Sequence, residues 1–284
     1  ARGTGGNVLI DSGYGTRRTM TLALVDRSLA GAPLHRIINT HTHSDHVGGN
    51  AALKARYGCR IAVPAGSFDA IRTWDHAAMH FVRMGQVCDR FDADDAIADG
   101  DRIEFGDLDW QVLGSPGHDM DSLLLYQARH GILISADALW ENGFGIVFPE
   151  FDGEPGFAAQ ADTLARLGAL DVAVVIPGHG RMFVDFAAAL ARARDRLAHF
   201  RTHPERHAWL ALKVTLSFLL LDRRRISLRD LATTFGELPL IRTIDRRFFG
   251  GDASRLTRDV VDSLLSSGAA RVQAGERLEY AVPL

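Results

Sequence analysis

From the start of the chain to about Gly180, the apolar positions fall into short runs. Polar or glycine-rich loops and stretches of helical periodicity lie between these runs. Short apolar runs bounded by turn residues are typical of buried strands. They predict strands at 8–10, 36–39, 61–63, 102–105, 109–113, 122–126, 132–135 and 172–176. The helical spacing predicts helices at 17–29, 49–57, 67–84, 156–167 and 186–200. Strands that alternate with helices in this way indicate an α/β fold.

After residue 203 the pattern becomes mainly helical. It predicts helices at 208–221, 227–235 and 253–267. Ser227 is the predicted N-terminal cap of the second of these helices. Two alternating runs in AARVQAGERLEYAV, on either side of AGE, predict a small β-hairpin. Three helices followed by a hairpin are the order of a winged-helix unit. We therefore expect a first domain at 1–203 and a small, mostly helical, winged-helix-like domain at 204–284.

The composition is that of an ordinary globular protein. Of 284 residues, 46% are hydrophobic and 24% are charged, and the formal net charge is -3. The longest apolar run without charge, 214–221, is too short to cross a bilayer, so we expect no membrane association. Cys59 and Cys88 have no CxxC spacing, which argues against a disulfide framework and against a thiolate metal site. These features predict a soluble protein with reduced thiols in the cytoplasm.

Histidines and aspartates gather in four motifs, each placed where a predicted strand runs out into a loop. The first motif is INTHTHSDHVGG, and the others are LGSPGHDMDS, LISADALW and VVIPGHG. Imidazole and carboxylate groups are the donors that borderline divalent cations prefer. The motifs therefore predict a metal site built from His41, His43, Asp45, His46, His118, Asp137 and His179.

The crowding of the first motif indicates two cations, because neighbouring side chains of an extended loop diverge and cannot all reach one ion. His41 and His43 can face one ion, while Asp45 and His46, beyond a local reversal, face another. Each ion then needs a third protein ligand, and two candidates remain, His118 and His179. A carboxylate has two oxygens, so the remaining candidate, Asp137, can bridge both ions.

These motifs resemble those of the metallo-β-lactamase superfamily, whose HxHxDH signature matches His41, His43, Asp45 and His46. The resemblance implies an αββα sandwich of two mixed sheets with helices outside and the metals at one edge. It implies that one ion is bound by His41, His43 and His118, and the other by Asp45, His46 and His179, with Asp137 as the bridge. Asp11 in LIDSG resembles an outer residue that steadies the metal loop. The family normally has strands before this motif, so we expect either a missing segment or a short first sheet.

Zinc β-lactamases resemble this chain less well, because they lack a carboxylate at the position of Asp137. The complete ligand set is instead similar to that of glyoxalase II and its relatives. This resemblance implies a metal-dependent hydrolase in which a hydroxide bridging two ions attacks a thioester, ester or lactone carbonyl. Asp137 and Asp45 are the expected catalytic carboxylates, with Asp45 orienting the nucleophile. We expect two Zn²⁺ ions, although the donors also suit iron or manganese. The alternative is a phosphodiesterase or endoribonuclease of the same fold, and a β-lactamase or a non-catalytic metal-binding protein is less favoured.

A small-molecule substrate is expected, because the loop after the predicted bridge carries aromatic side chains that can form an apolar wall, Trp140, Phe144 and Phe148. The ENGFG segment of that loop is alternatively a mobile lid. Nucleic-acid binding by DRRRISLRD stays open but is not favoured, because 13 basic and 10 acidic residues nearly balance in 204–284. An alternative interpretation is that residues 208–284 cover the site or mediate the formation of a homodimer.

Overall fold

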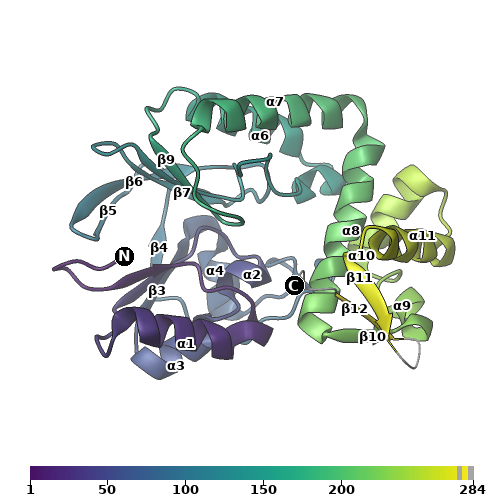
Figure 1. Ribbon diagram of the computed structural model, residues 1–284, viewed down its shortest axis with the longest axis horizontal. Coiled ribbons are helices and arrows are strands. Elements are labelled where there is room, and N and C mark those ends of the chain that lie inside the picture. The colour runs from purple at the N-terminus through teal and green to yellow at the C-terminus, as the bar shows by residue number, and fades with distance from the viewer. Residues whose placement is uncertain (274–276, 281–284) are drawn as a thin grey trace. The chain divides into compact units, whose positions relative to one another are not determined.

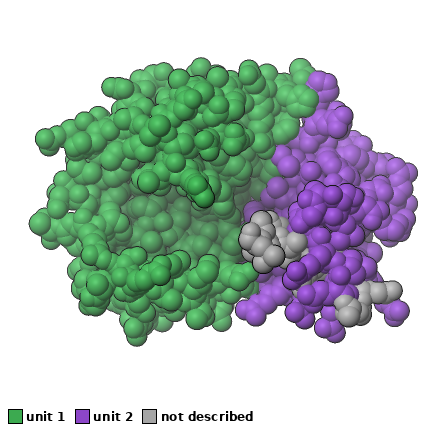
Figure 2. All heavy atoms as spheres, viewed as in Figure 1, with its two compact units in different colours: residues 1–79, 88–202 green, residues 80–87, 203–284 purple. Residues whose placement is uncertain are grey.

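The computed structural model describes residues 1–273 and 277–280, which form two compact units, drawn in different colours in Figure 2. Unit 1 contains residues 1–79 and 88–202, and unit 2 contains residues 80–87 and 203–284. The sequence analysis assigns residues 80–87 to the first domain, whereas the structure groups them with unit 2. The reason is close packing, since the backbone of Gly85 lies against the side chains of Leu219 and Leu238.

The first sheet of unit 1 has four strands in the order of the chain: β1 (Val8–Ile10), β2 (Arg36–Ile38), β3 (Arg60–Pro64) and β4 (Asp95–Ile97). All of these neighbours pair in parallel. Parallel neighbours require crossover connections, and these contain α1 (Arg18–Leu29) and α3 (Asn50–Tyr57), which lie outside this sheet (Figure 1). The pattern analysis missed β4, a three-residue edge strand of which only Ile97 is buried.

The second sheet has the strand order β5 (Arg102–Phe105), β6 (Leu108–Gly114), β7 (Leu123–Gln127), β8 (Ile132–Ala136) and β9 (Val174–Pro177). Pairing is antiparallel from β5 to β8 and parallel between β8 and β9. The antiparallel pair β7 and β8 confirms the hairpin predicted around QARHG. Helix α6 (Gly156–Leu167) connects β8 to β9, and α6 and α7 (Phe186–Thr202) lie outside this sheet (Figure 1).

The core of unit 1 lies between the two sheets. Val8, Ile38 and Ala62 of the first sheet belong to one buried cluster with residues of the second sheet that include Trp110 and Leu125. Burial of apolar side chains on facing sheets is the main favourable term that holds such layers together. The result is the αββα sandwich that the family resemblance implies.

The segment predicted as one helix at 67–84 forms two separate helices, α4 (Ala65–Thr73) and α5 (Phe81–Met84). The first helix ends because Trp74 adopts a left-handed conformation, with a φ of 57°. The carboxylate of Asp75 then accepts hydrogen bonds from the backbone N–H groups of Ala77 and Ala78. An aspartate that bonds to its own backbone neighbours in this way competes with helix formation. The prediction of a continuous helix is therefore wrong.

Unit 2 continues with α8 (Pro204–Arg223), β10 (Arg225–Ser227), α9 (Leu228–Thr234), α10 (Pro239–Ile244), a π-helical turn (Asp245–Phe249), α11 (Ala253–Ser266), β11 (Ala270–Gln273) and β12 (Arg277–Tyr280). The sequence pattern missed β10 and α10. Ser227 is the predicted cap, since its hydroxyl accepts the N–H of Arg229. Strands β11 and β12 form the predicted antiparallel pair, while its AGE turn lies outside the described residues.

Strand β12 pairs with both β10 and β11, which gives the small sheet of unit 2 the order β10-β12-β11. Among the described residues, none of the helices combines the length and the apolar character that crossing a membrane requires.

Candidate metal centre

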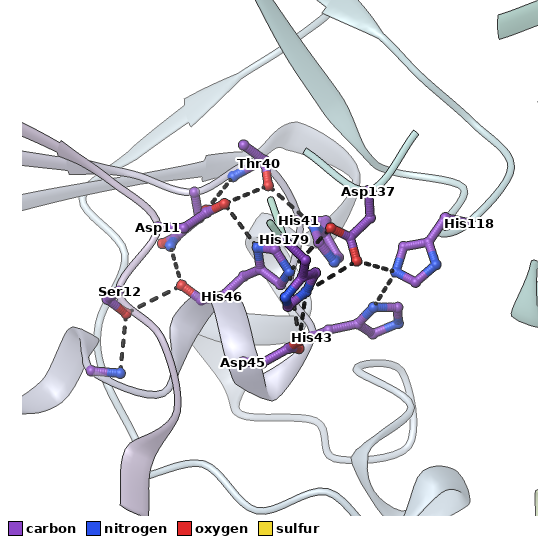
Figure 3. Close-up of polar contacts among 12 residues, drawn as sticks. Asp11, Ser12, Thr40, His41, His43, Asp45, His46, His118, Asp137 and His179 are labelled. Carbon is purple, nitrogen blue, oxygen red and sulfur yellow. Dashed lines mark hydrogen bonds and ion pairs between the residues drawn. The ribbon is translucent and has the colours of Figure 1, made fainter. Parts of the chain in front are cut away.

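Four loops of unit 1, each following the carboxyl end of a strand, carry the predicted metal-binding side chains. The loop after β2 runs into the short helix α2 (Ser44–Val47), and the other three follow β6, β8 and β9. Figure 3 shows that the side chains from these loops point toward one another: His41, His43, Asp45, His46, His118, Asp137 and His179. The structure therefore brings together every residue that the sequence analysis selected as a ligand.

The turn of helix α2 separates the donors of the first motif. His43 has extended backbone, with φ -62° and ψ 148°, and Ser44 begins the helix. The helix redirects the chain, so that Asp45 and His46 approach from a different side than the two histidines before them (Figure 3). This is the local reversal that two cations would require.

The first cluster, as we name it, consists of His41, His43 and His118. Nδ1 of His43 lies 2.8 Å from Nε2 of His118, and the ring centroids of His41 and His43 are 4.7 Å apart. All three side chains are buried. Burial lowers the pKa of His41 well below its usual value, and the neighbouring imidazoles lower it further. Burial, followed by the proximity of His43, also lowers the pKa of His118 to about 4.

Hydrogen bonds determine which nitrogen the first cluster presents. Nδ1 of His118 lies 2.5 Å from the backbone carbonyl of Ile146, and a carbonyl can only accept, so Nδ1 carries the proton. Nδ1 of His41 lies 3.1 Å from the hydroxyl of Thr40. The hydroxyl donates its own proton to Asp11, so it accepts the Nδ1–H of His41. In both imidazoles the lone pair is left on Nε2, the atom that faces the cluster.

The second cluster consists of Asp45, His46 and His179. Nε2 of His179 lies 3.1 Å from Oδ2 of Asp45, and Nε2 of His46 lies 3.7 Å from the same oxygen. Burial opposes protonation of both imidazoles, but hydrogen bonds to Asp137 and Asp45 raise the pKa of His179 to about 10. The negative charges of Asp45, Asp11 and Asp137 likewise raise the pKa of His46 well above its usual value.

Asp137 lies between the two clusters. Its Oδ2 is 3.5 Å from Nε2 of His118 in the first cluster and 3.5 Å from Nε2 of His179 in the second. Its Oδ1 is 3.6 Å from Nε2 of His46. Burial of this carboxylate would raise its pKa, but the surrounding imidazoles, His46 above all, hold the pKa well below the usual value. An ionised carboxylate in this place can contact ions on both sides.

Two buried nitrogens indicate that the site fits a cation. Nε2 of His41 and Nε2 of His46 are buried without a hydrogen-bond partner among the described residues. A buried polar atom without a partner costs about 1–3 kcal/mol, so such atoms need an explanation in a native structure. In the two clusters the ligand atoms lie within 4.8 Å of one another, close enough to share one ion in each cluster. Imidazole and carboxylate donors suit zinc and other borderline divalent cations.

Asp11 supports the second cluster from behind, and its backbone adopts the left-handed region with a φ of 54°. Its Oδ2 lies 2.8 Å from Nδ1 of His46, and its Oδ1 accepts the backbone N–H of Thr40 at 2.9 Å. The carboxylate therefore orients an imidazole and anchors the start of the first motif (Figure 3). A carboxylate that accepts the remote N–H of a metal-binding histidine sets the orientation of the ring.

Further polar residues, which the sequence analysis assigned no role, anchor the backbone carbonyl of His46. This carbonyl accepts the backbone N–H of Ser12 at 2.8 Å and the side-chain amide of Asn39 at 3.0 Å. Asn39 in turn accepts the amide of Asn50 at 2.7 Å. Gly49 has no room for a side chain, since a Cβ there would lie 2.4 Å from the carbonyl oxygen of Ser12. The available signals for this network were Asn39 at the end of a predicted strand and Ser12 in the loop after another.

The three aromatic residues predicted to form a substrate wall have different surroundings. The ring of Trp140 lies 5.4 Å from that of His179, and the ring of Phe148, in the 3-10 turn Phe148–Asp152, lies 5.5 Å from that of His43. Phe144 is instead fully buried, with Arg196 stacked 5.5 Å from its ring centroid. Its side chain therefore packs against Arg196 of helix α7 in the interior of unit 1.

The ENGFG segment contacts helix α7 through two of its backbone carbonyls. The guanidinium group of Arg192 donates to the backbone carbonyl of Glu141 at 2.9 Å, and that of Arg196 donates to the carbonyl of Asn142 at 3.4 Å. A Cβ at Gly145 would lie 2.5 Å from Nδ1 of His118, so the segment also packs directly on the first cluster.

Comparison with known sequences identifies relatives of the chain. The family profile of the metallo-beta-lactamase superfamily matches residues 1–179, which include all the residues of both clusters and Asp137. A hydroxyacylglutathione hydrolase from Rhodopseudomonas palustris (strain HaA2) is 34% identical over 140 residues, which are 49% of this chain and 46% of that protein. The chain thus spans about half the length of the curated relatives it matches.

Solved structures have the same fold. A metallo-beta-lactamase family protein of Thermus thermophilus, TTHA1429, has a TM-score of 0.57 at 22% identity, covering 98% of this chain and 91% of its own. TTHA1623, solved in a di-iron-bound form, has a TM-score of 0.51 at 26% identity, covering 68% of this chain and 88% of its own. Because the family profile covers most of the chain and the whole of the candidate metal centre, the chain belongs to the metallo-β-lactamase superfamily.

Proposed function

We propose that this protein is a dinuclear metal-dependent hydrolase that cleaves a thioester of a small molecule. The observation that carries the proposal is the position of Asp137, whose Oδ2 lies 3.5 Å from an imidazole of each cluster. A site for one ion would not need a carboxylate between two complete sets of donors. The curated relatives named hydroxyacylglutathione hydrolase support a thioester as the substrate class, and the di-iron form of TTHA1623 supports two ions.

The proposed ligands follow from the two clusters. His41, His43 and His118 would hold one ion, Asp45, His46 and His179 the other, and Asp137 would contact both. Zn²⁺ is the proposed metal, and iron or manganese would suit the same donors. When bound, such ions lower the pKa of a coordinated water toward neutrality and polarise a carbonyl oxygen.

The residues of the chain then have distinct tasks. The carboxylate of Asp45, whose Oδ2 lies 3.1 Å from Nε2 of His179, would orient the attacking water by accepting a hydrogen bond from it. The side chain of His179 is 42% exposed, which leaves the second cluster accessible from solvent. Phe148 is buried beside His43 and His118 and provides an apolar wall for the acyl group. No serine or cysteine is required as a nucleophile in this scheme.

We further propose that residues 204–284 form a winged-helix-like domain of a cytoplasmic enzyme. The three-stranded sheet β10-β12-β11 and the helices α8, α9 and α11 support this assignment.

The substrate class is tested by measuring metals per chain and comparing rates on several substrates with one preparation. Suitable substrates are S-acylglutathione, acyl-CoA, homoserine lactone, nitrocefin and bis(p-nitrophenyl) phosphate. We expect two ions per chain and faster turnover of a thioester than of the phosphodiester or the β-lactam. One ion per chain, or a phosphodiester as the best substrate, would contradict the proposal.

The bridging role is tested by Asp137→Ala. We expect turnover to fall by more than about 100-fold, because the loss of even an outer partner of a metal ligand costs about 10- to 100-fold. The metal content should fall below two ions per chain. Asp109→Ala is the matched control, since this carboxylate is exposed on β6 and pairs only with Arg102 among the described contacts. Full activity with two ions in Asp137→Ala would exclude the bridge.

A further inference from the structure

We infer that Trp140 is a positioning residue for the carboxylate of Asp137, which it binds through its indole N–H. Nε1 of Trp140 donates a hydrogen bond to Oδ1 of Asp137 at 3.3 Å. Trp140 is one of the residues predicted to form a substrate wall. Its position in the sequence did not predict a contact with a metal ligand. This inference rests on the proposed dinuclear centre, because it concerns how the carboxylate shared by the two ions is held.

The two oxygens of Asp137 have different neighbours. Oδ2 faces an imidazole of each cluster, at 3.5 Å from Nε2 of His118 and from Nε2 of His179. Oδ1 lies 3.6 Å from Nε2 of His46 and receives the indole N–H. Asp137 also forms a group with His41 and His46 in which the ligand atoms lie within 4.8 Å of one another. The indole N–H therefore holds one oxygen of a carboxylate that lies near both clusters and leaves Oδ2 facing His118 and His179.

The ring of Trp140 makes a second contact with the centre. Its centroid lies 5.4 Å from that of His179, with the two rings at 81° to each other. This edge-to-face arrangement is a favoured one for aromatic rings. His179 is the most exposed ligand candidate of the second cluster, with 42% of its side chain exposed. One residue thus contacts two ligand candidates that come from different loops.

The backbone around Trp140 is ordered by contacts that are independent of any ion. The N–H of Trp140 donates to the carbonyl of Gly143 at 2.6 Å, and the N–H of Gly145 donates to the carbonyl of Asp137 at 2.8 Å. The bond from Arg192 to Glu141 ties the same loop to helix α7. These contacts hold the backbone that carries the indole, as a positioning role requires.

The test compares two substitutions of Trp140 with a matched tryptophan elsewhere in unit 1. Trp140→Phe removes the N–H and keeps an aromatic ring, whereas Trp140→Leu removes both. Trp110→Phe is the control, because the indole N–H of this buried residue also donates to a carbonyl oxygen, that of Phe105 at 3.2 Å. Affinities for Zn²⁺ are measured by competition with a chelator, and the geometry of the centre by the absorption spectrum after Co²⁺ substitution.

We expect Trp140→Phe to bind the second Zn²⁺ about tenfold more weakly, the lower end of the range for loss of an outer partner. The Co²⁺ spectrum should change, and Trp140→Leu should lose more affinity than Trp140→Phe. Trp110→Phe should keep the affinity and spectrum of the unaltered protein, even if its melting temperature falls. Unaltered affinity and spectrum in Trp140→Phe would overturn the inference. A parent protein that binds fewer than two Zn²⁺ would instead overturn the proposed dinuclear centre.

Discussion

The two clusters of the candidate metal centre lie on either side of Asp137 but differ in charge. The first cluster (His41, His43 and His118) contains only imidazoles, and burial lowers the pKa of His41 and of His118. The second cluster (Asp45, His46 and His179) contains a carboxylate, and the nearby acidic groups raise the pKa of both imidazoles despite their burial. The first cluster thus consists of imidazole donors alone, whereas the second also contains the carboxylate of Asp45.

The outer partners of the imidazoles add to this difference, which Asp45, Asp137 and burial mainly set. In the first cluster, Nδ1 of His118 bonds to the neutral carbonyl of Ile146 and Nδ1 of His41 to the hydroxyl of Thr40. In the second cluster, Nδ1 of His46 bonds to the carboxylate of Asp11. A carboxylate partner raises the basicity of the ring more than a neutral acceptor does. The comparison teaches that similar ligand sets can be given different charge by the residues behind them.

The largest expected effect comes from removing one imidazole from each cluster in turn. We expect His41→Ala to lose the ion of the first cluster and to lower turnover by more than about 100-fold, beyond the range for outer partners. His179→Ala should keep the first ion and lose the second, because its side chain contacts only the second cluster and Asp137 among the ligand candidates. Mass spectrometry of the native protein counts the ions.

The control for these two variants is His130→Ala, which removes an imidazole that contacts Gln127 in the β7–β8 hairpin. This variant should bind two ions. If His179→Ala loses both ions, the two clusters do not act as separate sites, and the comparison fails.

A smaller effect is expected from Asp11→Asn, which removes the charge that contacts Nδ1 of His46 directly and reaches His41 only through Thr40. Asparagine tolerates the left-handed backbone of this position, so the substitution tests the carboxylate rather than the conformation. We expect the affinity for the second ion to fall by about 10- to 100-fold, with the first ion unaffected. Chelator competition measures both affinities.

Asp107→Asn is a close control, because Asp107 also has left-handed backbone and also accepts the N–H and hydroxyl of a threonine, Thr4. It should leave both affinities unaltered. Equal weakening of both ions in Asp11→Asn would mean that Asp11 supports the whole loop and not one cluster.

The smallest effect is expected from Thr40→Val, because the Thr40 hydroxyl contacts both His41 and Asp11 and so links the two clusters. Loss of one hydroxyl bond costs about 1 kcal/mol, which corresponds to about a fivefold loss of affinity. We expect both ions to weaken by similar factors in calorimetric titrations. Thr257→Val removes another buried hydroxyl, in unit 2, and should alter neither affinity. Weakening of one ion alone would assign Thr40 to a single cluster.

The residue pattern was sufficient to select the seven ligand candidates, because their chemistry is concentrated in short motifs at strand ends. It was also sufficient for the α/β class of unit 1, since each sheet strand except β4 appears as an apolar run, whereas the αββα arrangement followed from the family resemblance. The pattern failed where single contacts decide the outcome. Trp74 and Asp75 interrupt a periodic segment through a left-handed residue and a side-chain bond to the backbone, which periodicity does not record.

The aromatic loop illustrates the same limit. Trp140, Phe144 and Phe148 lie close together in the chain, and composition treats them alike. Packing separates them, because Arg196 of helix α7 covers Phe144, whereas Trp140 bonds to Asp137 and Phe148 lies beside His43. Helix α7 lies far along the chain from this loop, so no local pattern could predict the contact.

The family, the identity of the donors and most strands of unit 1 were readable from the chain alone, because local motifs and periodicity carry them. The tertiary structure decided which donors meet, which oxygen of Asp137 faces both clusters, and which imidazoles have a carboxylate behind them. Those features depend on side chains brought together from distant loops, and their distances and burial arise only when the two sheets pack. The pKa values of the histidines follow from that packing, since burial and neighbouring charge set them.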